Sequence, residues 1–116
     1  PFQGDEPKGL NMVNVGLPYG AKGDQLKAAV QEYWMPAFEA FRPQILYISA
    51  GFDAHRLDDM ANLGFVEEDY AWVTEQLVNV AHEHCAGRVV SLLEGGYNLG
   101  ALSRSVAAHL RELIAA

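Results

Sequence analysis

Apolar residues follow two different spacings along the chain, and together they predict strands that alternate with helices. Short apolar runs bounded by Gly, Pro or Asn predict strands at residues 11–17, 45–53 and 88–93. Apolar positions three and four residues apart predict helices at 24–41, 67–84 and from Asn98 toward the C-terminus. Because strands separated by helices are usually parallel, we expect an α/β fold over residues 11–116, with three parallel strands and three helices. Residues 1–10 are rich in Gly, Pro and charge, which predicts a loop before this βαβαβα unit.

Prolines and glycines predict where the helices bend and end. Pro36 falls inside the first helical pattern and should kink it, because its ring removes a backbone donor and crowds the preceding turn. Pro43 should end that helix, and Gly87 should end the second. The two tryptophans, Trp34 and Trp72, lie on apolar helical stripes and are expected in the core. A parallel sheet of only three strands leaves edges and faces uncovered, so the pattern predicts a piece of a larger sheet.

Length and composition narrow the class of protein. The chain has 116 residues, half of them apolar, which predicts one globular domain with a packed core. Its net charge is −7 and its pI about 4.9, which argues against a nucleic-acid-binding surface. The acids Glu67, Glu68 and Asp69 are read as favourable charges in the first turn of a helix.

The cysteine count and the hydropathy pattern indicate where in the cell the protein is expected. Cys85 is the one cysteine, so no intrachain disulfide forms and a reducing cytoplasm is the default expectation. No apolar run approaches the roughly 20 residues that a membrane helix needs. The first residue is Pro1 rather than Met, which suggests an excerpt of a longer protein.

Reactive side chains follow two of the predicted strands. Asp53 and His55 come directly after the strand at 45–53, where the ligand crevice of an open α/β sheet lies. Two residues apart in extended chain, they should point the same way, either as zinc ligands or as a hydrogen-bonded pair without metal. Because a catalytic zinc needs about three protein ligands, a further ligand would have to come from elsewhere.

Tyr97 follows the third strand after Gly95 and Gly96. The glycines allow close approach of the backbone, so the phenol could donate to a developing oxyanion; the alternative is a tyrosine that packs over a turn.

Four further side chains are weaker candidates for a functional site. His82, His84 and Cys85 lie near a helix end, but residues two apart on a helix do not share a face, so a metal site there is not expected. His109 is expected at the surface or between helices.

Two segments of the chain resemble the last signature segments of the histone deacetylase family. Ser49–Arg56 reads SAGFDAHR and Leu92–Leu99 reads LLEGGYNL. The likeness is to the class II-like and bacterial branch, which includes acetylpolyamine amidohydrolases and acetoin-utilisation proteins. It extends from about Asn11 to Leu113, including Phe41–Pro43 and Ser105–Ala107.

The resemblance implies a zinc-dependent hydrolase that deacetylates acetyl-lysine or acetylpolyamines, with an arginase/deacetylase fold. Asp53 matches the family's second aspartate zinc ligand, and Tyr97 matches its catalytic tyrosine. Gly95 and Gly96 match the glycines beside the acyl pocket, and Met60 matches an apolar wall of the substrate tunnel. His55 matches a frequent neighbour of the ligand rather than a ligand.

The match covers only the C-terminal segment of the family. The family's Asp-x-His zinc ligands, its tandem histidines that act as general base, and its principal potassium site all lie upstream of the matched region. The chain alone is therefore expected to be inactive, whereas the complete enzyme would bind zinc; the matched region leaves open whether it also binds potassium. The alternative is a non-catalytic α/β module that self-associates or pairs with another chain.

Overall fold

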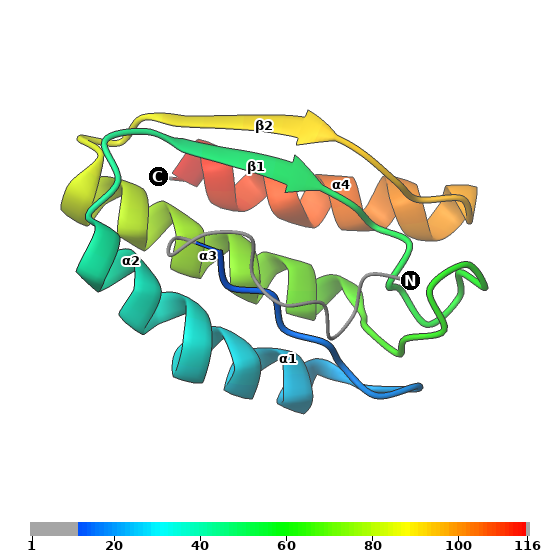
Figure 1. The fold of residues 1–116 in the computed structure, drawn as a ribbon. Coiled ribbons are helices and arrows are strands. Elements are labelled where there is room, and N and C mark those ends of the chain that lie inside the picture. Colours follow the sequence, from blue (N-terminus) through cyan, green and yellow to red (C-terminus); the bar gives the residue numbers. More distant parts are fainter. Residues whose placement is uncertain (1–11, 116) are drawn as a thin grey trace.

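A computed structural model of the chain describes residues 12–115. The elements are α1 (Gly23–Ala29), a π-helical turn η1 (Val30–Trp34), α2 (Met35–Phe41), β1 (Leu46–Ala50), α3 (Glu67–His84), β2 (Val89–Leu93) and α4 (Leu99–Ala115). The strands β1 and β2 are parallel neighbours, with Leu46 opposite Val89 and Ala50 opposite Leu93. The labelled helices lie on one side of this sheet (Figure 1). The α/β class and the parallel arrangement are confirmed.

The first of the three predicted strands is not formed. Residues 12–17 have no regular secondary structure, and Asn11 lies outside the described residues. Within residues 12–115 the sheet has two strands. An alternating segment becomes a strand only where a neighbouring strand accepts and donates its backbone hydrogen bonds, so the pattern of side chains is not sufficient.

The interruption predicted at Pro36 takes the form of the π-helical turn that directly precedes α2. A proline ring clashes with the carbonyl group four residues earlier, and a wider turn relieves that crowding. Pro36 then lies at the beginning of α2, and the amide of Met35 just before it donates to the carbonyl of Val30, five residues earlier. The helix ends at Arg42, whose left-handed φ of 56° turns the chain toward Pro43.

The core lies between the sheet and the helices. Its buried cluster consists of Leu46, Leu77, Ala81 and Cys85, and partly buried side chains from α2, α3 and both strands pack on it. Trp34 and Trp72 are only partly buried, contrary to the core prediction. The ammonium group of Lys27 lies 5.7 Å from the ring centroid of Trp72, which explains why that ring stays near the surface.

Helix α4 buries a different face from the one that its large apolar residues predict. Its buried residues are Ala101, Ser105, Ala108 and His109, whereas Leu99 is 77% exposed and Ile114 is 82% exposed. Small residues let two helices approach closely, so the contact with α3 selects the small face.

The sheet face that carries Tyr47, Ser49, Val90 and Leu92 is exposed. Tyr47 lies opposite Val90, and Ser49 lies opposite Leu92, so these side chains share one face of the pleat. Tyr47 is 65% exposed and Leu92 is 57% exposed. Parallel sheets are normally covered on both faces, and this arrangement is that of a partial domain. None of the helices within residues 12–115 is long and apolar enough to cross a membrane.

Candidate functional site

The segments that follow β1 and β2 stay side by side beyond the last paired residues. The amide of Glu94 donates to the carbonyl of Ala50 at 2.9 Å, and the amide of Phe52 donates to the carbonyl of Gly95 at 2.8 Å. Two loops that are far apart in sequence therefore leave the same end of the sheet together. Asp53 lies on one loop, and Gly95, Gly96 and Tyr97 lie on the other.

Asp53 lies between two glycines, one from each loop. A Cβ atom placed on Gly51 or on Gly95 would lie 3.4 Å from Oδ1 of Asp53, so both backbones are in close reach of this carboxylate. The residue is partly buried, and within residues 12–115 its carboxylate has no hydrogen bond or ion pair. Partial burial of an unpaired carboxylate is unfavourable, and a cation bound there would compensate for it. The residue thus fits one corner of a metal site.

Tyr97 is 60% exposed beside this carboxylate-bearing loop. The preceding Gly96 has φ of 137°, and a Cβ atom there would lie only 2.7 Å from Cδ1 of Leu102. This backbone conformation and the close approach both require glycine. The alternative of a tyrosine packed over the turn does not describe the structure, since most of the side chain is accessible. The phenol is therefore open to a ligand at the strand ends.

Met60 lies near Tyr97 because one carboxylate holds both backbones. Asp58, which is 5% exposed, accepts the amide of Met60 on Oδ1 at 3.0 Å. Its Oδ2 accepts the amides of Tyr97 at 2.6 Å and Asn98 at 2.9 Å. Burial raises the pKa of Asp58, but the three backbone donors outweigh that effect and hold the pKa below its usual value. The structure thus brings together the predicted residues Asp53, Met60, Gly95, Gly96 and Tyr97 at one end of the sheet.

Asp58 is the residue of this region that the sequence analysis missed. Its partners on the second loop lie 39 and 40 positions away, so no local pattern indicates them. The one local indication of its role was the order Asp58-Asp59-Met60, which allows an Asx-turn. In such a turn the aspartate side chain accepts a hydrogen bond from the amide two residues later, as Asp58 does from Met60.

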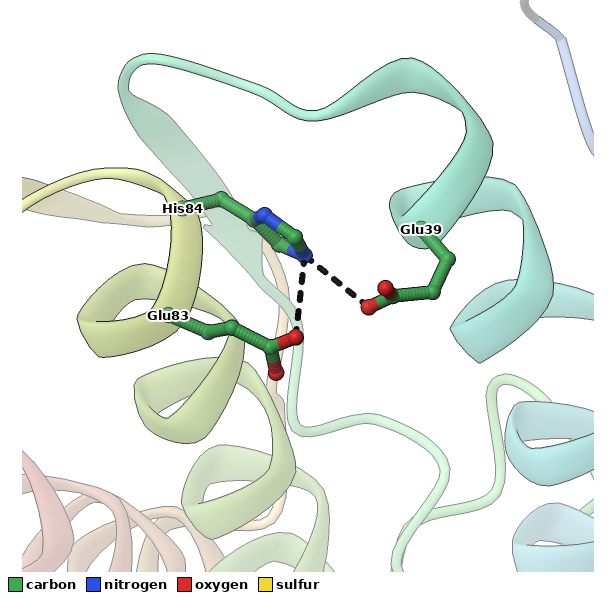
Figure 2. A group of neighbouring side chains, drawn as sticks. All are labelled: Glu39, Glu83 and His84. Carbon is green, nitrogen blue, oxygen red and sulfur yellow. Dashed lines mark hydrogen bonds and ion pairs between the residues drawn. The ribbon is translucent and has the colours of Figure 1, made fainter.

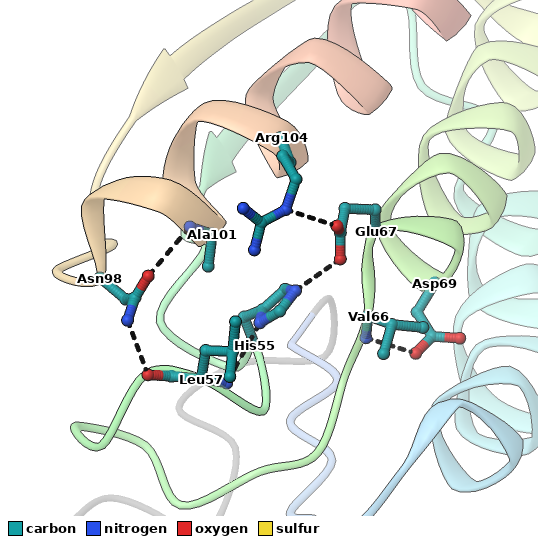
Figure 3. A network of polar contacts seen from close by, with 8 residues as sticks. All are labelled: His55, Leu57, Val66, Glu67, Asp69, Asn98, Ala101 and Arg104. Atoms are coloured by element: carbon teal, nitrogen blue, oxygen red, sulfur yellow. Dashed lines mark hydrogen bonds and ion pairs between the residues drawn. The ribbon is translucent and has the colours of Figure 1, made fainter.

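His55 does not pair with Asp53, which corrects the expectation from their spacing. The ring is 1% exposed, and its Nε2 lies 2.6 Å from Oε1 of Glu67 on α3. Its Nδ1 accepts the amide of Leu57 at 3.1 Å, so Nε2 carries the proton that it donates to Glu67 (Figure 3). Both ring nitrogens are occupied, and neither is left for a metal. The extended geometry assumed for residues 53–55 is replaced by a turn, in which His55 donates its amide to the carbonyl of Phe52 at 3.5 Å.

Glu67 links this histidine to the last helix. Its Oε2 accepts from Nε of Arg104 at 2.8 Å (Figure 3). The hydrogen bonds from His55 and then Arg104 lower the pKa of Glu67 from 4.5 to about 2, against the opposing effect of burial. The acids of the first turn of α3 are Glu67, Glu68 and Asp69. Two of them are also bonded within the fold, because Asp69 accepts the amide of Val66 on Oδ2 at 2.9 Å (Figure 3).

His82, His84 and Cys85 do not converge on one point. His84 Nε2 lies 3.0 Å from Glu39 on α2 and 3.6 Å from Glu83 on α3 (Figure 2). The two glutamates are exposed, whereas the His84 side chain is largely buried. The hydrogen bond from His84 is the main reason that the pKa of Glu39 is lowered. Cys85 is fully buried, and its thiol donates to the carbonyl of Pro43 at 3.2 Å. The contact between Glu39 and His84 is thus a hydrogen bond that joins α2 to α3.

His109 was expected either at the surface or between helices, and the structure shows the second of these. Its Nδ1 lies 2.7 Å from the hydroxyl of Thr74 on α3, and its Nε2 lies 2.8 Å from the hydroxyl of Ser91 on β2. The Thr74 hydroxyl donates its single hydrogen to the carbonyl of Tyr70, so Nδ1 of His109 is the donor to Thr74 and Nε2 accepts from Ser91. Burial lowers the pKa of His109, which favours this neutral form.

The fold and the site define the chain as part of a parallel α/β domain with a carboxylate and a phenol at the carboxyl ends of its strands, where such sheets bind ligands. Residues 2–113 match the family model for the histone deacetylase domain, and the chain belongs to this family.

Relatives and solved structures agree with this assignment. Type-2 histone deacetylase 2 of Dictyostelium discoideum is 40% identical over 111 residues, covering 90% of this chain and 6% of that protein. Histone deacetylase 14, chloroplastic, of Arabidopsis thaliana is 41% identical over 102 residues, covering 88% and 24%. Histone deacetylase-like amidohydrolase of Pseudomonas aeruginosa is 35% identical over 94 residues, covering 81% and 24%. The crystal structure of the HDA15 HD domain matches with a TM-score of 0.76 and 33% identity, covering 83% of this chain and 26% of that one. The chain thus spans about a quarter or less of each of these four proteins.

Proposed function

We propose that the chain is the C-terminal segment of a zinc-dependent deacetylase that hydrolyses acetyl-lysine or acetylpolyamine-type amides. The observation that carries the proposal is the convergence of Asp53 with the Gly95–Tyr97 turn at one end of the sheet. Family membership supports the same reaction class. A lone buried cysteine, Cys85, supports a reducing compartment such as the cytoplasm.

Each side chain has a separate role in this proposal. Asp53 is one ligand of the zinc ion, because its carboxylate is partly buried and unpaired within residues 12–115. Zinc bound by Asp53 and further ligands would supply a Lewis acid for the amide carbonyl and for a nucleophilic water. Tyr97 donates its phenolic hydrogen to the carbonyl oxygen of the acetyl group, where negative charge develops during attack. Gly95 and Gly96 lie beside the acyl pocket in this proposal, and the exposed Met60 forms an apolar wall for the substrate chain.

The remaining parts of the site come from outside this chain. A catalytic zinc takes about three protein ligands, and Asp53 provides one of them. His55 provides none, because Glu67 and the Leu57 amide occupy its ring. We therefore expect residues 1–116 alone to be inactive, and we expect potassium, where the complete enzyme binds it, to lie in the part that this chain lacks.

Acetate release from an acetyl-lysine peptide tests the proposal. In the complete protein, Tyr97→Phe should lower kcat by about 10²- to 10³-fold, the usual cost of one oxyanion donor, with zinc content unchanged. Asp53→Ala should lose both turnover and zinc. Tyr47→Phe is the matched control, because Tyr47 is equally exposed but lies on the open sheet face.

Two results would contradict the proposal. Normal turnover of Tyr97→Phe would remove the tyrosine from the reaction. Release by residues 1–116 alone that depends on Asp53 would show that this segment recruits its own further ligands and base.

A second candidate function is a non-catalytic module that associates through its uncovered sheet. The exposed face at Tyr47, Val90 and Leu92 favours it, as does a cleft of about 430 Å³ between α2 and β1 with largely apolar lining. Here the occupant is a second copy of the chain. Light scattering of purified residues 1–116 should then show a monodisperse dimer, whereas a soluble monomer would exclude this function.

A further inference from the structure

Asp58 joins the two loops that carry the candidate site. It is 5% exposed, and its two carboxylate oxygens face different segments. Oδ1 accepts the amide of Met60 within its own loop, and Oδ2 accepts the amides of Tyr97 and Asn98 across the site. The side chain of Asn98 reinforces the link, because its Nδ2 donates to the carbonyl of Leu57 at 3.0 Å. Three of these four hydrogen bonds cross between the loops.

We propose that Asp58 is a positioning residue that holds the Tyr97 turn and the Met60 loop in their working arrangement. The inference rests on the proposed deacetylase function, in which Tyr97 is the catalytic residue. Asp58 itself touches neither substrate nor metal in this proposal.

The local chain explains why Tyr97 depends on this carboxylate. Pairing in β2 ends at Leu93, and the last sheet-like contacts are those of Glu94 and Gly95. Gly95 and Gly96 then leave the backbone with more conformational freedom than other residues would. The Tyr97 side chain is largely exposed, so packing contributes little to its position. Within the described part of the chain, the backbone amide of Tyr97 donates a hydrogen bond to Asp58 at 2.6 Å, and this bond fixes the turn directly.

The same carboxylate also lies at the beginning of α4. Oδ1 of Asn98 accepts the amide of Ala101, which caps this helix. A negative charge close to a helix N-terminus is favoured by the helix dipole. The capped helix, the Tyr97 turn and the Met60 loop thus meet at one side chain, and a change there alters the placement of two site residues at once.

Asp58→Asn tests this role with almost no change of shape. The asparagine side chain has one carbonyl oxygen, which can accept either from Met60 or from the Tyr97 and Asn98 amides. Its NH₂ group then faces the remaining backbone N–H, and two donors cannot form a hydrogen bond. We expect kcat of the complete protein to fall by about 10- to 100-fold through misplacement of the reacting group, with zinc content unchanged. Asp59→Asn is the matched control, because Asp59 is an exposed neighbour of the same charge.

A double-mutant cycle separates positioning from a general structural effect. If Asp58 acts through the Tyr97 hydroxyl, Asp58→Asn should reduce kcat much less in a Tyr97→Phe background than in the wild type. An equal fold-loss in both backgrounds would overturn the proposal, as would a wild-type kcat for Asp58→Asn.

Amide hydrogen exchange keeps the inference independent of the proposed activity. The amides of Tyr97 and Asn98 should exchange faster in Asp58→Asn than in Asp59→Asn, with the amides of α3 unchanged. If the wild-type protein fails to deacetylate, the proposed function falls, and unchanged exchange at Tyr97 would separately refute the hydrogen-bonded link on which the positioning role depends.

Discussion

Glu67 should stabilise the fold in a way that depends on pH, because it accepts from His55 and Arg104 at once. The informative change is Glu67→Gln. Glutamine keeps the shape and an oxygen that accepts from His55, but it removes the negative charge and turns an NH₂ group toward Arg104.

The size of the effect follows from the pKa of the carboxyl group. Its pKa falls from 4.5 to about 2 in the folded protein. At 1.36 kcal/mol per pKa unit this corresponds to at most about 3 kcal/mol. The Glu67 side chain is 28% exposed and that of Arg104 is 51% exposed, so solvent screening reduces the arginine contribution. We expect Glu67→Gln to lower the free energy of unfolding by about 1–2 kcal/mol at pH 7.

The pH dependence has a definite sign. The folded state holds the Glu67 proton more weakly than the unfolded state, so the unfolded chain binds more protons between pH 4.5 and about 2. The stabilisation is therefore complete above pH 4.5 and is lost as the pH falls toward 2. Urea denaturation at pH 7, 5 and 3 should show the gap between the wild type and Glu67→Gln shrinking with acid.

Glu68→Gln is the control for charge and for the helix dipole. Glu68 lies in the same first turn of α3 but is exposed. An equal loss of unfolding free energy in Glu67→Gln and Glu68→Gln would refute the reasoning. So would a difference between the wild type and Glu67→Gln that stays constant from pH 7 to pH 3.

Two further changes test the packing of the site and the core. Gly96→Ala should cost about 1–3 kcal/mol because φ is 137° and the new Cβ meets Leu102, as judged from urea midpoints. Gly20→Ala, where φ is 76° and no atom lies within 4 Å, should cost less, and an equal cost would contradict the packing argument. Burial lowers the pKa of His109 below 6.5, so its contribution to stability is present above pH 6.5 and lost as the pH falls below it. His109→Gln should flatten the slope of the unfolding free energy against pH between pH 7 and 5, and a slope equal to that of the wild type would exclude the assignment.

Local patterns were sufficient for the elements that depend on local chemistry. The prediction for α3 matched Glu67–His84, because its apolar spacing, its acidic first turn and the following glycine all act within the helix. The strands β1 and β2 lie inside their predicted ranges for a similar reason, since each is a short apolar run bounded by breakers. The placement of Asp53 and Tyr97 directly after strands was also predictable from the chain.

Other features depended on partners that are distant in sequence. Residues 12–17 alternate like a strand but have no strand neighbour within the described part of the chain, so the pattern alone did not make one. The buried face of α4 was decided by its close contact with α3, which selects small residues over the larger apolar stripe.

The polar partners at the site show the same division. Spacing alone suggested that His55 would point the same way as Asp53, as a zinc ligand or as its hydrogen-bonding partner, whereas the folded chain turns the ring toward Glu67 on α3. Spacing also gave no reason to select Asp58, whose carboxylate reaches a loop about forty positions away. Periodicity and turn chemistry act over a few residues and so determine which segments become helices and strands. A buried polar group is stable only when it has a hydrogen-bonding partner. Which residue serves as that partner depends on the tertiary structure, because the partner can be distant in sequence.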